Sequence, residues 1–318
     1  MKSLVPSVRQ GGCGRVIVMP NLNPPIANSK QALDYWNELS SIAPEVTFLM
    51  TLYLTEELTV EDLRVAQETA HVIGVKSYPR GVTTGSDAGV EDYGKFYHIF
   101  EAMQDLGLSL HLHGEVPGHS VLVAEQLFLP ELLKIHATFP KLKIVLEHVT
   151  SEAAVHAVIN CGPTVAATIT VHHLDLTIDA VVGNSFNFCK PVAKLESDRA
   201  ALRKVIADGN KKFFLGSDSA PHGKSKKLQC CAAAGVFTQP WLLAYLADAL
   251  DRIGCLPRLF DFACKNGSEF FGISQASEIF VKLVREPFTV PAEYSCDGEE
   301  DVVPYRAGDT LRFRIYLL

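Results

Sequence analysis

The sequence lacks a long apolar run, since no stretch reaches the roughly 18 residues that a membrane-spanning helix requires. Its start also lacks the basic segment, apolar block and small-residue cleavage site of a secretory signal. Positive charge is scarce, because 36 acidic residues outnumber 29 Lys and Arg and leave a net charge of −7. A nucleic-acid-binding protein usually shows a basic stripe. We therefore expect a chain that binds neither a membrane nor nucleic acid.

The cysteines show no spacing typical of a metal finger or a disulfide scaffold. There are eight of them, none forms a CxxC pair, and only Cys230 and Cys231 are adjacent. Such usage is typical of a reducing compartment. The sequence therefore predicts a cytoplasmic protein.

The bulk composition favours a large folded core. Hydrophobic residues make up 47% of the chain and charged residues 20%, which argues against disorder. A length of 318 residues suits one α/β barrel with a C-terminal extension.

Short apolar runs alternate with longer amphipathic stretches up to about residue 272. Seven runs resemble strands, at residues 15–19, 46–54, 74–78, 108–113, 143–148, 165–171 and 212–217. Helical patterns include residues 30–42, 60–73, 93–106, 121–138 and 198–207. Thr59 and Ser151 are suitable caps for two of the helices. The alternation predicts βαβ units and a parallel sheet, the α/β class, although an eight-stranded barrel needs one strand more.

Metal-seeking side chains stand at the C-terminal ends of four predicted strands, namely Lys76, His113, His148 and Asp218. Active sites of βα barrels are built at this end of the sheet. A single histidine there is more often structural, but four such residues at four strand ends favour a metal site. Histidine and carboxylate ligands suit zinc.

Lys76 differs from the other three, because a lysine in a buried strand is costly unless its charge is paired or removed. Reaction with carbon dioxide would give a carbamate, an anionic ligand able to bridge two metals. The alternative is a salt bridge, and the residues by themselves favour that alternative.

Two pairs of histidines could each be taken for metal ligands. His111 and His113 share one face of a strand, and we select His113 because it stands at the strand's end. His172 and His173 follow another strand, where polar rim positions or substrate contacts are favoured over metal ligation.

With these motifs the chain resembles the dihydroorotases, in particular the monofunctional type of bacteria and fungi. The matching segments are VMPNLNPP, GVKSYPRGVTT, LHGE, LEHVTS, AATITVHHL, NFCKPVAK, FLGSDSAPH, CAAAGVF and VPYRAGDTLRF. They extend over almost the whole chain. The resemblance implies a metal-dependent amidohydrolase on a (βα)8 TIM-type barrel. It also implies reversible hydrolysis of dihydroorotate to N-carbamoyl-L-aspartate in pyrimidine biosynthesis, with a small-molecule substrate. A homodimer is left open as the assembly.

The resemblance implies two Zn²⁺ ions in each active site and assigns ligands to them. Lys76 corresponds to the carbamylated lysine that bridges the metals, and His113 and His148 to ligands of the second zinc. Asp218 corresponds to a ligand of the first zinc and to the catalytic proton shuttle.

Substrate contacts are implied in the same way. Asn21 and His222 would hold the substrate carboxylate. The main chain of Lys190 and of Gly235 would contact the dihydropyrimidine ring.

The loop at residues 79–90 is rich in Gly, Thr and Ser and follows the Lys76 strand. Its composition alone fits a mobile lid or a flexible connector equally well. The resemblance favours the lid and places Thr83 and Thr84 at its tip.

One departure from the family pattern stands out. Dihydroorotases begin with a strand that carries HxHxR, in which both histidines bind the first zinc and the arginine binds the substrate carboxylate. The sequence contains no such segment. We therefore expect strands 2 to 8 of the barrel within residues 1–273, and a C-terminal extension, residues 274–318, packed on the barrel. Two alternatives remain: a hydantoinase- or allantoinase-like amidohydrolase, or a catalytically inactive barrel that serves as a binding module.

Overall fold

The computed structural model describes residues 2–69, 71–274, 280–298 and 300–318. Its contacts divide the chain into two compact units. The first unit comprises Arg15–Val149 and His156–Ala167, and the second comprises Met1–Gly14, Thr150–Val155 and Thr168–Leu318. Within the described residues, no helix has both the length and the apolar character needed to cross a bilayer.

All seven predicted strands are present, in one sheet with the order β1-β2-β3-β4-β5-β6-β7. Their bounds are β1 (Arg15–Val18), β2 (Thr47–Tyr53), β3 (Val72–Ser77), β4 (Ser109–Leu112), β5 (Ile144–Leu146), β6 (Val165–Ile169) and β7 (Phe213–Leu215). Each of the first five pairs in parallel with the next. Strands β4, β5 and β6 are buried along their whole length, as expected for a parallel sheet covered on both faces.

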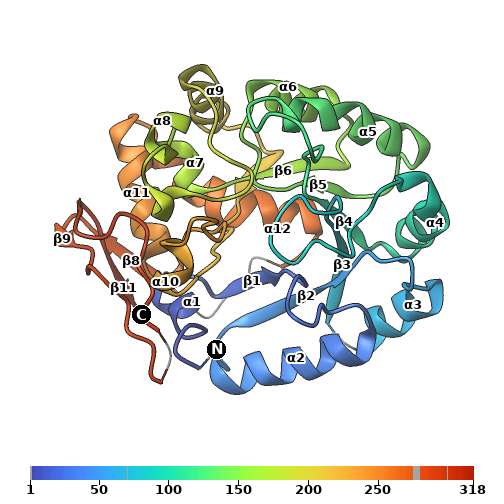
Figure 1. The fold of residues 1–318 in the computed structure, drawn as a ribbon, viewed down its shortest axis with the longest axis horizontal. Helices are drawn as coiled ribbons and strands as arrows, with labels where there is room; N and C mark the ends of the chain where they lie inside the picture. Colours follow the sequence, from blue (N-terminus) through green and yellow to red (C-terminus); the bar gives the residue numbers. More distant parts are fainter. Residues whose placement is uncertain (1, 70, 275–279, 299) are drawn as a thin grey trace. The chain divides into compact units, whose positions relative to one another are not determined.

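Helices alternate with the strands of the first unit, and Figure 1 shows α2 to α5 ranged along one side of β1 to β5. They are α2 (Ser29–Ile42), α3 (Val60–Thr69), α4 (Tyr97–Leu106), which a 3-10 turn η1 (Tyr93–Phe96) precedes, and α5 (Ala124–Thr138). Helix α6 (Glu152–Asn160) follows β5. Both predicted caps are confirmed: Thr59 Oγ1 accepts the N–H of Asp62 at 3.1 Å, and Ser151 Oγ accepts that of Ala154 at 3.2 Å.

Several helix boundaries differ from the sequence prediction. The helix predicted to reach residue 73 ends at Thr69, because the β-branched Val72 and Ile73 extend as β3 and pair with β2. Helix α5 begins at Ala124, three residues later than predicted. Helix α9 begins at Glu196 instead of at residue 198.

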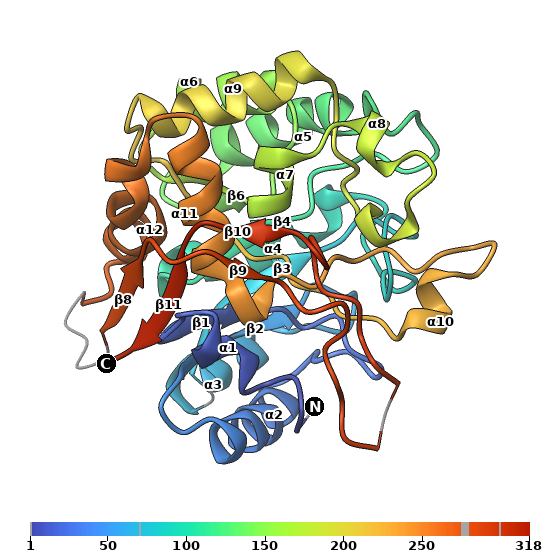
Figure 2. The ribbon, with the colours of Figure 1, turned by 90° about the vertical axis from the view of Figure 1, so that its left-hand side faces the viewer.

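The second unit holds the remaining helices and two small sheets. Its helices are α1 (Ser7–Gln10), α7 (Val171–Asp175), α8 (Ile178–Val181), η2 (Ser185–Asn187), α9 (Glu196–Ala207), α10 (Lys224–Lys227), η3 (Gln239–Trp241), α11 (Leu242–Arg252), η4 (Leu256–Arg258), the π-helix η5 (Asp261–Lys265) and α12 (Asn266–Phe271). Near the C-terminus, β8 (Val281–Val284) pairs antiparallel with β11 (Arg314–Leu317), as Figure 2 shows. Strands β9 (Phe288–Thr289) and β10 (Thr310–Leu311) form a second antiparallel pair. The division at residue 273 stays a prediction, and the compact units divide the chain elsewhere.

Asp248 on α11 ties the C-terminal segment to the rest of the second unit. Its carboxylate is 2% exposed and accepts hydrogen bonds from Arg306 Nη1 at 2.7 Å and Arg312 Nε at 2.9 Å. Burial alone would raise the pKa of Asp248, but the hydrogen bonds from the two arginines outweigh it and hold the pKa below its ordinary value. The charge therefore stabilises the fold at neutral pH.

We expect Asp248→Asn to lower the free energy of unfolding by about 3 kcal/mol, because it leaves two partly buried arginines without their anion. Since the pKa is lowered on folding, this contribution is complete above the unfolded value of 3.8 and is lost as the pH falls below it. Urea titrations of both proteins at neutral and acid pH measure the difference. Glu286→Gln, a control for the exposed pair with Arg314, should cause no measurable change. An equal loss in the Asp248 variant at both pH values would contradict this account.

Candidate active site

Lys76 lies inside the first unit, near the end of β3. Its side chain is 1% exposed, and Nζ stands 4.9 Å from the centroid of the Tyr78 ring. The two residues share a face because side chains two apart along a strand point the same way. A lysine buried near the end of a strand is the feature that the sequence singled out at this position.

His113 and His148 join Lys76 in the same cluster. The rings of the two histidines are 4.7 Å apart, edge to face, and the His113 ring is 6.2 Å from that of Tyr78. Both histidines are buried, at 1% and 7% exposure. Strands β4 and β5 are neighbours in the sheet, so the residues that follow them come together. Three of the four predicted metal ligands therefore lie together in the first unit.

Glu115 was missed in the sequence, although it stands two residues after His113. Its Oε2 lies 2.8 Å from His113 Nε2, and the carboxylate is 4% exposed. Histidines that bind metals usually donate their other ring N–H to such a carboxylate, which fixes the tautomer and the ring orientation. With Nε2 donating to Glu115, Nδ1 of His113 is the atom suited to hold a metal.

His111 has a different environment. Its Nδ1 lies 2.6 Å from Glu147 Oε1 and its Nε2 lies 2.8 Å from Ser109 Oγ. Ser109 in turn donates to the carbonyl of Ile73 at 3.0 Å. Both ring nitrogens thus serve hydrogen bonds inside the sheet, which supports the choice of His113 as the ligand. Glu147 directly precedes His148, so this chain of bonds also anchors the backbone that carries His148.

Two of the proposed ligands adopt an uncommon backbone conformation. His148 and Asp218 both have φ = 41°, in the left-handed region that residues with a side chain rarely adopt. Such conformations are costly and concentrate at functional sites. No sequence pattern revealed this shared feature.

The predicted lid is docked by its tip in the first unit. Asn21 Nδ2 donates to the carbonyl of Thr84 at 3.3 Å, and the Tyr53 hydroxyl donates to that of Gly85 at 3.2 Å. Gly85 has φ = +70°, and a Cβ there would lie 3.1 Å from the Asn21 carbonyl oxygen. Two predicted substrate contacts, Asn21 and Thr84, are therefore neighbours, while Thr83 is bound to Ser86 within the loop.

The second unit brings His222 and Gly235 together. His222 Nε2 donates to the Ala234 carbonyl at 3.0 Å, and burial lowers the pKa of the imidazole, so it is neutral at pH 7. Gly235 has φ = +154°, and a Cβ there would meet the Ala220 carbonyl oxygen at 2.4 Å, so only glycine fits. The Gly235 N–H donates to the carbonyl of Phe188, in the segment that leads to Lys190.

Lys227 on α10 was not singled out in the sequence, yet it organises this region. It is 4% exposed, and Nζ donates to the carbonyls of Phe188 at 2.9 Å, Ala233 at 2.9 Å and Gly235 at 2.7 Å. Burial lowers the pKa of Lys227 to about 8, so the ammonium is still protonated at neutral pH. One side chain therefore holds both segments that carry the predicted ring contacts. A basic run, KSKK, was the available signal, but such runs are usually exposed.

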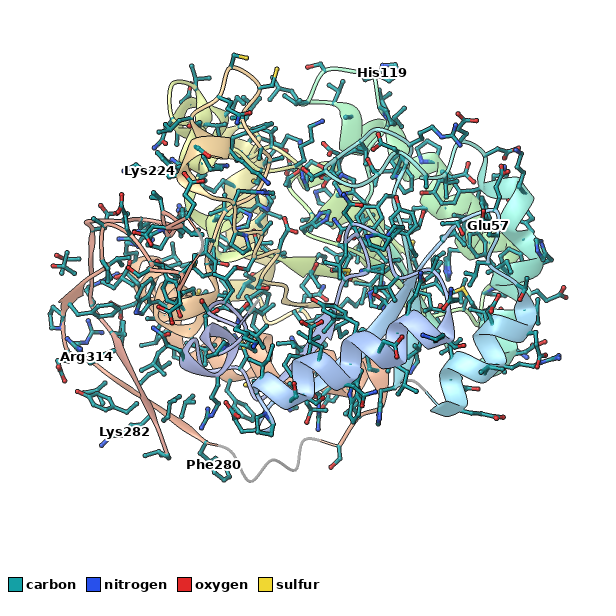
Figure 3. All side chains as sticks on the ribbon, turned by 60° about the horizontal axis from the view of Figure 1, so that its bottom comes forward. Glu57, His119, Lys224, Phe280, Lys282 and Arg314 are labelled. Carbon is teal, nitrogen blue, oxygen red and sulfur yellow. The ribbon has the colours of Figure 1, made fainter. Side chains whose placement is uncertain are left out.

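We expect Lys227→Met to lower the free energy of unfolding by roughly 2–4 kcal/mol, because three buried carbonyls lose their donor. Lys224→Met is the matched control: Lys224, labelled in Figure 3, belongs to the same helix. Its side chain is 47% exposed in its pair with Glu293. That control should show no measurable change. Chemical denaturation of the two variants checks the comparison, and similar effects would exclude a special role for Lys227.

The sequence favoured polar rim positions or substrate contacts for His172 and His173, and the burial of both rings contradicts the rim position only. The two rings are 0% and 1% exposed. Burial lowers the pKa of His173 to about 3 and that of His172 well below its ordinary value, so both are neutral. The short helix α7, which Thr170 caps through the His173 N–H, turns both side chains inward.

Comparison with known proteins agrees with this architecture. The amidohydrolase family matches residues 5–281. The probable dihydroorotase of Schizosaccharomyces pombe is 47% identical, over 98% of this chain and 93% of the relative. The dihydroorotase of Mycosarcoma maydis is 42% identical, over 99% of this chain and 94% of the relative. A crystal structure of dihydroorotase from Saccharomyces cerevisiae in complex with 5-fluoroorotic acid matches with a TM-score of 0.96 and 40% identity, over 99% of this chain and 93% of that one.

These likenesses confirm the predicted α/β barrel of the amidohydrolase kind, of which the described residues contain seven strands in the main sheet. They extend over nearly the whole chain at identities well above those that show a fold alone. The chain therefore belongs to the amidohydrolase family and, within it, to the dihydroorotases.

Proposed function

We propose that the chain catalyses the reversible hydrolysis of dihydroorotate to N-carbamoyl-L-aspartate at a zinc site that includes Lys76, His113, His148 and Asp218. The observation that carries this proposal is the buried cluster of Lys76, His113 and His148 in the first unit. Asp218 belongs to the second unit, and its role rests on the family resemblance.

The donor set fits zinc. Two imidazoles and a carboxylate are ligands that Zn²⁺ prefers, and carbamylation of Lys76 would add an anionic oxygen ligand. Carbamylation would also remove the cost of burying an ammonium, since Lys76 is 1% exposed. Bound zinc supplies Lewis acidity, which polarises the amide carbonyl and lowers the pKa of water.

The protein's own residues would move protons and orient the substrate. Asp218 would accept the proton of the attacking water and deliver it to the leaving ring nitrogen. Asn21 and His222 would hold the substrate carboxylate, and the main chain of Lys190 and of Gly235 would contact the ring. A carboxylate beside His222 would raise the pKa of that imidazole and favour a proton on Nδ1, since Nε2 donates to Ala234.

The loop at residues 79–90 would close over the ligand with Thr83 and Thr84 at its tip. In this structure Asn21 Nδ2 donates to the Thr84 carbonyl, and because an amide NH₂ carries two N–H groups, the same side chain could also hold a substrate carboxylate. Docking of the loop and recognition of the carboxylate are therefore coupled through Asn21. The 5-fluoroorotic acid named with the yeast relative is a pyrimidine carboxylate, which supports this class of ligand.

A reducing, cytoplasmic compartment is part of the proposal. The described residues contain no disulfide, and all eight cysteines are in the thiol form.

The number of protein ligands available to each zinc provides a test of the proposed function. The sequence contains no His-x-His-x-Arg segment, so the proposed ligands suffice for one zinc bound by Lys76, His113 and His148, and leave the other with Lys76 and Asp218 alone. We expect an added N-terminal strand with His-x-His-x-Arg to raise the zinc content by about one per chain and to produce or strongly increase turnover of dihydroorotate. Metal analysis and an assay in both directions measure this.

The control carries Ala-x-Ala-x-Ala in the added strand and should gain neither zinc nor turnover. Hydantoin and allantoin serve as competing substrates. Preference for either of them would replace the proposed substrate. An extended chain that gains the additional zinc but hydrolyses none of the three would instead identify an inactive binding module.

A further inference from the structure

A cluster of nitrogen and sulfur atoms lies in the second unit, made of residues other than the proposed zinc ligands. The ligand atoms of His172, His173 and Cys189 all lie within 4.8 Å of one another. All three side chains are buried, with at most 1% exposure. His172 and His173 come from α7 and Cys189 from the segment before α9, so the fold brings them together across 15 residues or more.

The ring of His172 is buried without hydrogen bonds to the described residues. Neither of its ring nitrogens has a hydrogen-bond partner among the residues that the structure describes, although the ring is 0% exposed. A neutral imidazole carries one N–H donor and one lone pair, and burying both unsatisfied costs free energy. Its neighbours are the His173 ring at 4.4 Å and the Tyr305 ring at 6.3 Å. A metal cation is a partner to which the lone pair of the imidazole could donate.

The distances suit a tetrahedral ion. Cys189 Sγ lies 3.6 Å from His173 Nε2. With Zn–S near 2.3 Å and Zn–N near 2.0–2.1 Å, two ligands of a tetrahedral zinc stand about 3.6 Å apart. The Pro191 carbonyl oxygen is 3.0 Å from the same Nε2 and 3.3 Å from Sγ, so it is placed as a fourth donor.

We propose that His172, His173 and Cys189 form a thiolate-containing metal site for a borderline-soft divalent cation, Zn²⁺ in particular. Two imidazoles and a thiolate select against Mg²⁺ and Ca²⁺, which require oxygen ligands. The ligand set differs from Lys76, His113, His148 and Asp218 because it contains sulfur.

Metal binding can displace the protons of the Cys189 thiol and of His173 Nε2 without moving these side chains. Nε2–H of His173 and the thiol of Cys189 both donate to the Pro191 carbonyl in this structure. Metal binding releases the thiol proton to solvent and moves the His173 proton from Nε2 to Nδ1. There Thr170 Oγ1, 2.8 Å away, accepts it. A ring N–H held by a neighbouring oxygen is the usual support for a histidine that binds a metal.

The site would stiffen the segment that carries Lys190, because Cys189 and Pro191 flank that residue. This consequence rests on the proposed function, in which the Lys190 main chain contacts the ring. The metal site itself does not.

Titration of the whole chain with Co²⁺ tests the proposal. Cobalt bound to a thiolate gives a charge-transfer absorption band in the near ultraviolet, which nitrogen and oxygen ligands do not give. We expect this band in the wild-type chain and in His113→Ala, which removes a ligand of the other site. Cys189→Ser should abolish it, and His172→Asn should weaken cobalt binding by at least about tenfold. Cys230→Ser, a control at an exposed cysteine, should keep it.

A folded wild-type chain that shows no band at saturating Co²⁺ would overturn the proposal, as would a band that persists in Cys189→Ser. If Cys189→Ser does not fold, as circular dichroism would show, His172→Asn decides, because a residue that only packs would leave cobalt affinity unchanged. Failure of the dihydroorotate assay with the band intact would refute the proposed reaction and leave this site standing.

Discussion

An Asp218→Asn variant is expected to lose turnover of dihydroorotate by about 10³-fold or more in both directions, measured in the chain with the added His-x-His-x-Arg strand. An amide cannot take the proton from water or return it to the ring nitrogen. Asn tolerates the left-handed backbone that Asp218 adopts at φ = 41°, so the loop after β7 should keep its shape. The loss would therefore report on chemistry and not on folding.

Substrate affinity should fall much less than turnover, because Asn21, His222 and the main chain of Lys190 and Gly235 are proposed to orient the ligand. Steady-state kinetics in both directions separate the two quantities. Asp208→Asn is the control: Asp208 forms an exposed pair with Lys204 at the end of α9 and should leave turnover unchanged. An Asp218 variant that retains a tenth or more of kcat would remove this residue from the mechanism.

Replacing Lys76 is expected to remove metal and turnover together. Lys76→Met keeps most of the side-chain volume over Tyr78 but cannot form a carbamate, whereas Lys76→Ala also opens space in the core. We expect both variants to lose zinc from the cluster that contains His113 and His148. Short carboxylic acids should restore part of the activity to the Ala variant, which has room for them, and not to the Met variant.

Zinc analysis, turnover and a thermal melt of each variant make the comparison. Lys95→Ala, which removes an exposed partner of Glu56, should retain metal and activity. A Lys76→Met protein with full zinc content and normal turnover would exclude the carbamate. A Co²⁺–thiolate band at His172, His173 and Cys189 that is unchanged in Lys76→Met would show that the two metal sites are independent.

Several parts of the fold were predictable because their signal is local. The apolar runs that became β2, β4, β5 and β6 are bounded by polar or turn residues and separated by amphipathic helices. Strand and helix periods differ, so a window of ten residues distinguishes them. The same locality explains the caps at Thr59 and Ser151, whose hydrogen bonds reach three residues along the chain.

Boundaries and the C-terminal sheets were less predictable, because distant partners decide them. Val72 and Ile73 continue an apolar pattern that also suits a helix, and pairing with β2 makes them a strand. Strand β8 finds its partner, β11, about 30 residues further along the chain. Neither choice depends on the residues next to it in sequence.

In the candidate site, the order of residues along the strands indicated Lys76, His113 and His148, and these three do lie in one cluster. Their supporting residues were not evident. Glu115 and Glu147 resemble ordinary surface acids in the sequence, yet each is buried against a histidine.

The sequence by itself determined the succession of strands and helices and the chemical types at the strand ends, since both follow from short-range periodicity and side-chain chemistry. Only the tertiary structure decided which groups meet. It buried Lys227 against three carbonyls, although its basic neighbours suggested an exposed helix. It also turned His172 and His173 away from the rim and towards Cys189. Hydrogen-bond partners and burial depend on residues that are far apart in the chain, and no local pattern records them.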